Sequence, residues 1–267
     1  MTPAPASDRD GALAHFGLGQ GPKATVLLHG FLGSGRNLRS LAQLWLERDP
    51  SRRFLVPDLR GHGDAPPLGP GDSLATLAND VLATTKAGGL HPPVRLVGHS
   101  LGGRVALVAA DLEPALFDQV VVLDIGPGAT PPALSESRRV LDVLLAAPEV
   151  ASDRARMRAH LMEQGLSRPL ADWLLMNLRP GAGGALTWRF DRQALADLHA
   201  RFSAQDLWPL VERAEVPLHF IRGENSSYLS PRDAERLARL GCVVDTLPAA
   251  GHFVHVDAPG PLVDLLL

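Results

Sequence analysis

Short apolar segments alternate with amphipathic segments through the first half of the chain. The apolar segments are four or five residues long and rich in valine and leucine, which is typical of parallel strands covered on both faces. The pattern predicts strands at 25–28, 54–57, 94–97 and 119–123, and helices at 37–48, 73–86 and 101–111. Ser73 is the predicted N-cap of the second helix. Strands and helices alternate as in βαβ units, so we predict an α/β protein with a mainly parallel sheet and helices on both faces.

The alternation of strand and helix stops at Gly126. About ninety residues follow with helical periodicity and no convincing strand. Helices are predicted there at 135–147, 153–164, 170–177 and 192–202. The α/β pattern then resumes with strands at 218–221 and 243–247, and with helices at 231–239 and from 261 to the end. We therefore predict a core domain of residues 1–126 and 210–267, interrupted by a helical insertion of residues 127–209.

A serine lies at the turn between the third predicted strand and the helix that follows it. The turn reads Gly98-His99-Ser100-Leu101-Gly102, with glycines on both sides of the serine. Such glycines are needed where a strained residue brings the strand and the helix close together. Ser100 is thereby placed at the carboxyl ends of the strands, where open α/β sheets bind their ligands. We predict that Ser100 is a nucleophile; the alternative is an ordinary turn between a strand and a helix.

Three further segments accompany the serine turn. His29-Gly30-Phe31-Leu32-Gly33 follows the first predicted strand, Asp58-Leu59-Arg60-Gly61-His62-Gly63-Asp64 follows the second, and Gly251-His252-Phe253-Val254-His255 lies near the end. Together and in this order, the four segments resemble the α/β-hydrolase superfamily over almost the whole chain. The resemblance implies the α/β-hydrolase fold, with the insertion forming a helical cap after the sixth strand. It also implies an oxyanion hole built from the backbone amides of Phe31 and Leu101.

His252 is the predicted base. A serine hydroxyl is a poor nucleophile until a base removes its proton, and His252 follows the last strand in a glycine-flanked loop. The order of serine, acid and then histidine also fits this fold. His255 could form a metal-binding pair with His252, but no further cluster of ligands supports a metal site, so we expect none. His29, His62 and His99 are interpreted as structural.

The carboxylate that would orient His252 has two candidates. In most members of the superfamily it follows the seventh strand in a Gly-x-x-Asp pattern, but the matching stretch here reads Gly223-Glu224-Asn225-Ser226. A serine thus stands where the aspartate is expected. Asp124 ends the preceding strand at the same sheet edge, and we predict that Asp124 is the acid. Glu224 remains its rival.

Three segments resemble one branch of the superfamily, the YbfF-like bacterial esterases and their mitochondrial relatives. They are Trp188-Arg189-Phe190, Asp124-Ile125-Gly126-Pro127 and Gly223-Glu224-Asn225-Ser226-Ser227-Tyr228. The branch carries its acid after the sixth strand, and this resemblance therefore favours Asp124. Glu224 departs from the pattern, because a glycine is usual at that position.

Composition excludes several classes of partner. The 26 basic and 29 acidic side chains give a net charge of −3, so the chain has no strong positive field and nucleic acid is not an expected partner. The longest run of apolar residues and glycine is six residues long, far short of the ~18 that a membrane span needs. The first ten residues lack a secretory pattern, which predicts a cytoplasmic location. The single cysteine, Cys242, excludes an internal disulfide and a cysteine-rich zinc site, and is interpreted as a core thiol.

These features predict a serine hydrolase without a cofactor. It would cleave short to medium acyl carboxylic esters or thioesters through an acyl-enzyme. Carbon–carbon bond hydrolases, lactonases and cofactor-free haloperoxidases carry the same motifs and remain alternatives, whereas haloalkane dehalogenases and epoxide hydrolases have an aspartate where Ser100 stands. A non-catalytic ligand receptor on the same fold is the alternative from another class. A phosphate loop at Gly30–Gly35 is disfavoured, because no Lys-Ser/Thr pair follows in register. The oligomeric state is left open.

Overall fold

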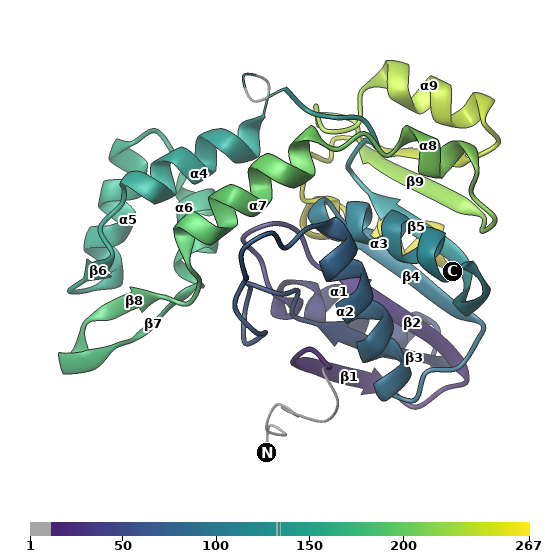
Figure 1. Ribbon diagram of the computed structural model, residues 1–267, viewed down its shortest axis with the longest axis horizontal. Coiled ribbons are helices and arrows are strands. Elements are labelled where there is room, and N and C mark those ends of the chain that lie inside the picture. The colour runs from purple at the N-terminus through teal and green to yellow at the C-terminus, as the bar shows by residue number, and fades with distance from the viewer. Residues whose placement is uncertain (1–11, 132, 134) are drawn as a thin grey trace.

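The computed structural model describes residues 12–131, 133 and 135–267, and a seven-stranded sheet forms its centre (Figure 1). The strands lie in the order β1-β3-β2-β4-β5-β9-β10. Their bounds are His15–Gly19 (β1), Lys23–Leu28 (β2), Arg52–Pro57 (β3), Val94–His99 (β4), Phe117–Leu123 (β5), Leu218–Gly223 (β9) and Val243–Leu247 (β10). Neighbouring strands are parallel except for β1, which runs antiparallel to β3. The predicted α/β class and the mainly parallel sheet are confirmed.

The strand β1 was not predicted from the sequence. It forms the edge of the sheet, and its side chains are half-buried or exposed. Two of its five residues are glycines, so the segment lacks the continuous apolar run that marks the central strands. The other six strands contain the segments predicted for them.

Each central strand contributes to two hydrophobic clusters, one on each face of the sheet. In β5, Val120 and Val122 belong to one cluster, while Val121 and Leu123 belong to the other. The first cluster includes residues of α2 (Leu74–Ala87), α3 (Leu101–Leu112), α8 (Trp208–Glu212) and α9 (Pro231–Arg239). The second includes residues of α1 (Arg39–Arg48), α10 (Val254–Asp257) and α11 (Pro259–Leu266). Helices therefore cover both faces, and this is why the central strands are apolar without interruption.

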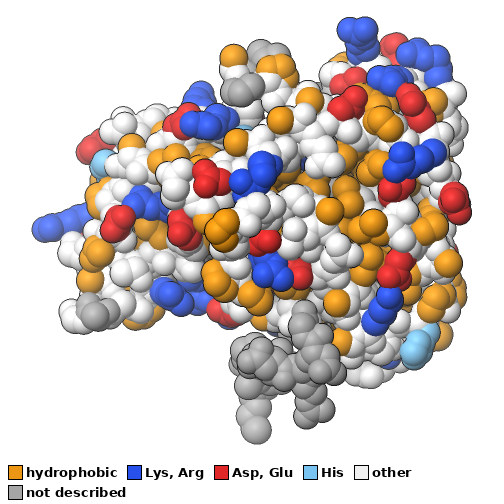
Figure 2. All heavy atoms as spheres, viewed as in Figure 1, with side chains coloured by type: hydrophobic (Ala, Val, Ile, Leu, Met, Phe, Trp, Pro, Cys, Tyr) orange, Lys and Arg blue, Asp and Glu red, His pale blue; other side chains and the backbone are white. Residues whose placement is uncertain are grey.

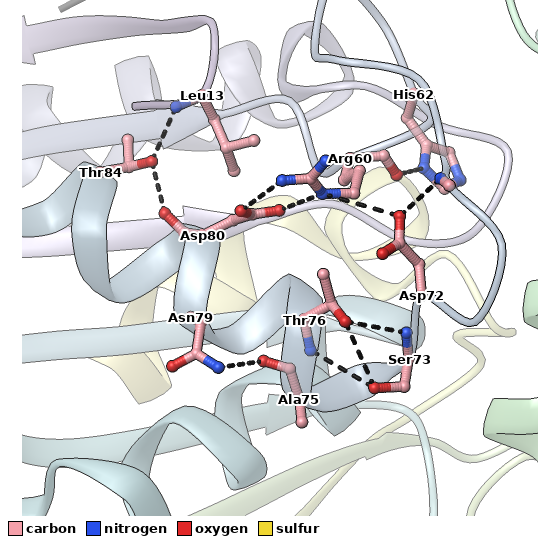
Figure 3. A network of polar contacts seen from close by, with 11 residues as sticks. Leu13, Arg60, His62, Asp72, Ser73, Ala75, Thr76, Asn79, Asp80 and Thr84 are labelled. Carbon is pink, nitrogen blue, oxygen red and sulfur yellow. Dashed lines mark hydrogen bonds and ion pairs between the residues drawn. The ribbon is translucent and has the colours of Figure 1, made fainter. Parts of the chain in front are cut away.

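A polar network ties the loop after β3 to α2 (Figure 3). Arg60 donates two hydrogen bonds to the Asp80 carboxylate of α2, at 2.6 and 2.7 Å. Ser73 caps α2 as predicted: its hydroxyl accepts from the Thr76 amide, and the Thr76 hydroxyl accepts from the Ser73 amide. His62 donates from Nδ1 to the Arg60 carbonyl at 3.0 Å. The middle of α2 thus holds the loop after β3 through the contact between Asp80 and Arg60.

Residues 127–209, called the insertion below, contain four longer helices and a small sheet. The helices are α4 (Glu136–Ala146), α5 (Arg154–Glu163), α6 (Arg168–Leu175) and α7 (Arg192–Ala204). The sheet has the order β6-β8-β7, with β6 at Val150–Ala151, β7 at Leu178–Pro180 and β8 at Leu186–Trp188. The expectation of no strand here was wrong, because strands of two or three residues are too short to produce a periodic pattern.

The insertion leaves the sheet after β5, the strand that the superfamily's numbering counts as the sixth. Figure 1 shows its helices and small sheet grouped to one side of the large sheet. The helix α8 crosses positions 209 and 210, where the sequence analysis divides the insertion from the core. The division into a core and a cap stays a prediction.

The chain passes between the core and the insertion twice, near residues 126–128 and near residue 205, and these two segments are called the crossings below. Arg104 of α3 binds both of them. Its Nη1 donates to the carbonyls of Gly126 and Gly128, each at 3.0 Å, and its Nη2 donates to the carbonyl of Gln205. The side chain is 2% exposed. Burial lowers the pKa of Arg104 to about 10, so the guanidinium remains charged at neutral pH. Backbone carbonyls from both crossings therefore surround one buried cation.

The surface drawn in Figure 2 carries acidic and basic side chains intermixed, with no large area of one sign. Within the described residues, no helix is both long enough and apolar enough to cross a bilayer. Cys242 is half-buried, less than a core thiol would be, and its burial raises the pKa of the thiol. The first ten residues, on which the expected absence of a secretory signal depends, lie outside the described residues.

Candidate active site

Ser100 occupies a strained turn between β4 and α3. Its φ of 53° and ψ of −117° are unusual for a residue with a side chain. The flanking glycines are required by contact: a Cβ on Gly98 would lie 2.2 Å from the Gly102 carbonyl oxygen, and a Cβ on Gly102 would lie 2.5 Å from the Leu28 carbonyl oxygen. The Ser100 amide donates to the Leu123 carbonyl at 2.9 Å. The turn therefore places the serine where strand and helix meet most closely.

His252 and Asp124 come together from segments 128 residues apart. His252 lies in the loop between β10 and α10, and its Nδ1 donates to Asp124 Oδ2 at 2.8 Å. Asp124 directly follows β5 and is completely buried. With the Nδ1 proton held by the carboxylate, Nε2 is the ring nitrogen left to exchange a proton. Ser100 and His252 line the same cavity.

The Asp124 carboxylate is satisfied on both oxygens. The Gly223 amide donates to Oδ1 at 2.8 Å, and the Ser226 hydroxyl and His252 Nδ1 both donate to Oδ2. Ser226 stands where most of the superfamily carries its acid, so the residue at that position still contacts the carboxylate. The sequence alone predicts no role for this serine.

Glu224, the rival acid, has a different set of contacts. Its Oε2 accepts from the Ala249 amide at 2.9 Å, and its own amide donates to the Leu247 carbonyl at 3.0 Å. The residue is exposed. Among the described contacts of Glu224, none is to His252, and the structure brings Asp124 rather than Glu224 to the imidazole.

The two residues whose backbone amides are expected to form an oxyanion hole, Phe31 and Leu101, line one cavity together with Ser100. Phe31 belongs to the turn that follows β2, which the Gly33 amide closes by donating to the Gly30 carbonyl at 3.1 Å. Leu32 in this turn has a φ of +61°, a left-handed conformation that costs a residue with a Cβ about 1–2 kcal/mol. Leu101 opens α3 directly after Ser100. Within the described residues, no protein acceptor is recorded for either amide.

The cavity beside Ser100 holds about 790 Å³ of empty space, part of it open to solvent. Core residues form one wall, and the insertion contributes Glu136, Ser137, Arg139, Val140, Leu170 and Trp173. A smaller cavity of about 380 Å³ also reaches Ser100 and Phe31. Concave sites lined by apolar side chains with a few polar groups are typical of small-molecule sites. Ser100 therefore lines both cavities.

The apolar residues of the insertion serve different purposes. Trp173 lines the larger cavity. Leu144, Leu161 and Leu174 are fully buried in the hydrophobic cluster, as expected for a packed subdomain. Met162 and Met176 are exposed, and Leu134 lies outside the described residues.

The neighbouring histidines are held neutral by burial. His29 donates from Nδ1 to the Gly30 carbonyl and accepts at Nε2 from the Leu59 amide, and burial lowers its pKa to about 4. His99 donates from Nε2 to the His252 carbonyl at 2.8 Å, and burial holds its pKa well below the ordinary value. Burial likewise lowers the pKa of His255 to about 4. In the described part of the chain, no group of three potential ligands is arranged to hold a metal ion.

Tyr228 is a contact of the site that the sequence analysis missed. Its ring stacks on the imidazole of His252, with centroids 3.7 Å apart and an interplanar angle of 16°. Burial raises the pKa of Tyr228 to about 12, so its phenol is neutral. The lone tyrosine of the chain gave no periodic or motif signal beyond the segment that resembles YbfF-like esterases.

Comparison with known protein families matches residues 25–265 to the alpha/beta hydrolase family. The chain belongs to this family. Among its relatives, the sn-1-specific diacylglycerol lipase ABHD11 of Mus musculus is 34% identical over 90% of this chain and 78% of its own. Esterase YbfF of Escherichia coli is 27% identical over 88% of this chain and 87% of its own.

Solved structures agree with this assignment at the level of the fold. A marine microorganism esterase superposes with a TM-score of 0.87 at 23% identity, covering 96% of this chain and 98% of its own. The predicted α/β-hydrolase fold and the predicted resemblance to YbfF-like esterases are both confirmed.

Proposed function

We propose that this member of the family is a serine hydrolase that cleaves short to medium acyl carboxylic esters or thioesters through an acyl-enzyme. One observation carries the proposal: a buried carboxylate bonds to an imidazole that shares a cavity with a serine in a strained turn. The relatives' names, a lipase and an esterase, support ester cleavage. The proposed residues are Ser100 as nucleophile, His252 as base and acid, and Asp124 as the orienting carboxylate.

The reaction follows from this arrangement in two steps. The Ser100 oxygen attacks the acyl carbon while His252 Nε2 takes its proton, and the carbonyl oxygen becomes an oxyanion that the amides of Phe31 and Leu101 hold. When the bond to the leaving group breaks, His252 returns the proton to that group. A water molecule then repeats the sequence on the acyl-enzyme and releases the acid. Asp124 stabilises the imidazolium in both steps and keeps its own charge.

The insertion is proposed to act as a cap that shapes the substrate site. Its residues supply one wall of the larger cavity and also line the smaller cavity that reaches the serine. The cytoplasmic location stays a prediction.

A series of p-nitrophenyl esters and acyl thioesters from acetyl to dodecanoyl tests the proposal. We expect a burst of product equal to the enzyme concentration, the highest kcat/KM for short or medium chains, and loss of turnover in Ser100→Ala. A ligand receptor would bind the esters without turnover. Product formation that persists in Ser100→Ala would refute the mechanism.

A further inference from the structure

The turn that carries Phe31 includes a residue in a costly conformation. Leu32 has a left-handed backbone, although its side chain is a leucine and is 2% exposed. The closing bond from the Gly33 amide to the Gly30 carbonyl fixes the ends of the turn. It does not hold the carbonyl of Leu32. The Gly33 amide and the Leu32 carbonyl belong to the same peptide plane, so the closing bond holds one end of this plane, while the carbonyl at its other end still needs a partner of its own.

A side chain of the insertion supplies that contact. Asn177 lies between α6 and β7, is 5% exposed, and donates from Nδ2 to the Leu32 carbonyl at 2.9 Å. The two residues are 145 positions apart in the chain. Asn177 lines neither of the two cavities that reach Ser100. It therefore acts on the turn rather than on a substrate.

The insertion holds Asn177 rigidly. The Asn177 amide donates to the Leu174 carbonyl at 3.0 Å, and its carbonyl accepts from the Arg189 amide at 2.9 Å. Arg154 of α5 donates to the carbonyls of Leu175 and Leu178, on either side of Asn177. The Asn177 side chain is therefore oriented before any substrate binds, and it can hold the turn that carries Phe31 in a fixed position. Electrostatic stabilisation of an oxyanion requires donors that are fixed in this way.

We infer that Asn177 is a positioning residue for the oxyanion hole. Its bond to the Leu32 carbonyl anchors the second end of the peptide plane that the Gly33 amide already holds, and so stiffens the turn that presents the Phe31 amide. The insertion then contributes to the chemical step through a backbone contact as well as through the shape of the cavity. This inference rests on the proposed function, because it concerns an oxyanion formed at Ser100.

Three substitutions of Asn177 test it. Asn177→Asp keeps the volume but replaces the amide donor by an acceptor, Asn177→Ala removes the side chain, and Asn177→Ser leaves a hydroxyl too short to span the gap. With p-nitrophenyl butyrate we expect kcat to fall about tenfold to a hundredfold, less than the loss of a whole oxyanion donor. KM should stay within about twofold, because the neutral ground-state carbonyl gains little from the donors.

A transition-state analogue separates positioning from general stability. An alkyl trifluoromethyl ketone adds the Ser100 oxygen to its carbonyl carbon, His252 takes the proton, and the product carries an oxyanion. Its Ki should rise by the same factor by which kcat/KM falls in each variant. Arg189→Gln is the matched control, because it breaks the insertion's ion pair with Asp64 of the core and keeps the Leu32 contact. Both constants should stay within about twofold of the wild type in this control.

Each result decides the matter. If a folded Asn177 variant keeps its kcat, or loses kcat with an unchanged Ki, Asn177 does not position the oxyanion hole. If all three variants fail to fold by circular dichroism, its role is structural and the inference is wrong. Wild-type protein without Ser100-dependent ester turnover would overturn the proposed function, and this inference with it. Normal wild-type turnover beside unaffected Asn177 variants would overturn this inference alone.

Discussion

Replacing Asp124 by asparagine tests the proposed acid with the smallest change of shape. Three donors surround the carboxylate: the Gly223 amide at Oδ1, and the Ser226 hydroxyl and His252 Nδ1 at Oδ2. The NH2 group of an asparagine must face one of these two sides, so a donor meets a donor in either orientation. With the NH2 toward His252, the imidazole changes to the tautomer protonated on Nε2, which cannot accept a proton from Ser100.

We expect Asp124→Asn to lower kcat about ten-thousandfold, as the same change does in serine proteases. This factor corresponds to ~5 kcal/mol of lost transition-state stabilisation. Glu224→Gln is the matched control. The contact of Glu224 is with the Ala249 amide, which a glutamine carbonyl can also accept, so kcat should change by about twofold or less.

Steady-state and burst kinetics with p-nitrophenyl butyrate at neutral pH measure both effects. A double variant, Asp124→Asn with Ser226→Asp, places a carboxylate at the position usual for the superfamily. The Ser226 side chain already reaches Asp124, so this carboxylate lies near the imidazole, and we expect about tenfold or more recovery over the single variant. The reasoning is refuted if Asp124→Asn keeps more than about a tenth of the activity, or if Glu224→Gln suffers the larger loss.

Three further predictions concern the nucleophile, acid stability and the crossings. Ser100→Ala should abolish the burst. Because the substitution leaves the packing around residue 100 unchanged, the melting temperature should stay within a few degrees of the wild type. Labelling of the variant by a fluorophosphonate would contradict the assignment. The pKa of His29 is lowered to about 4 by burial, so the unfolded chain binds its proton more readily between pH 6.5 and 4. As the pH is lowered from 6.5 to 4, His29 should therefore reduce the free energy of unfolding by up to ~3 kcal/mol. A free energy of unfolding that stays constant over this pH range in urea titrations would contradict this. Arg104→Met removes the hydrogen bonds to Gly126, Gly128 and Gln205 and should lower the free energy of unfolding by about 2–4 kcal/mol; an unchanged urea midpoint would show that the crossings do not depend on it.

The sequence predicts those parts of the fold that local pattern determines. The buried strands have continuous apolar runs, and Ser73 caps its helix through residues only three positions away. The edge strand β1 and the strand β6 lack such runs and pair with segments distant in the chain, whereas β7 and β8 pair with each other across a short loop but are only three residues long.

The candidate site divides in the same way. Ser100 and His252 lie in local motifs, so the sequence identifies them. The choice between Asp124 and Glu224 depends on where two adjacent strands end and on which way a side chain points, and Glu224 turns toward Ala249. Asn177 and Tyr228 act through contacts with residues far away in the sequence. A local sequence pattern does not predict such contacts.

The position of Arg104 restricts how the enzyme could be re-engineered. A foreign lid grafted between β5 and β9 would inherit a buried cation that needs carbonyl oxygens from both ends of the transplanted segment. Chimeras whose junctions lie between residues 128 and 205 keep the native carbonyls of Gly126, Gly128 and Gln205, whereas junctions outside that range replace them and leave the Arg104 charge of α3 dependent on the foreign segment. Lid exchange among relatives should therefore succeed or fail at the splice points rather than in the lid itself.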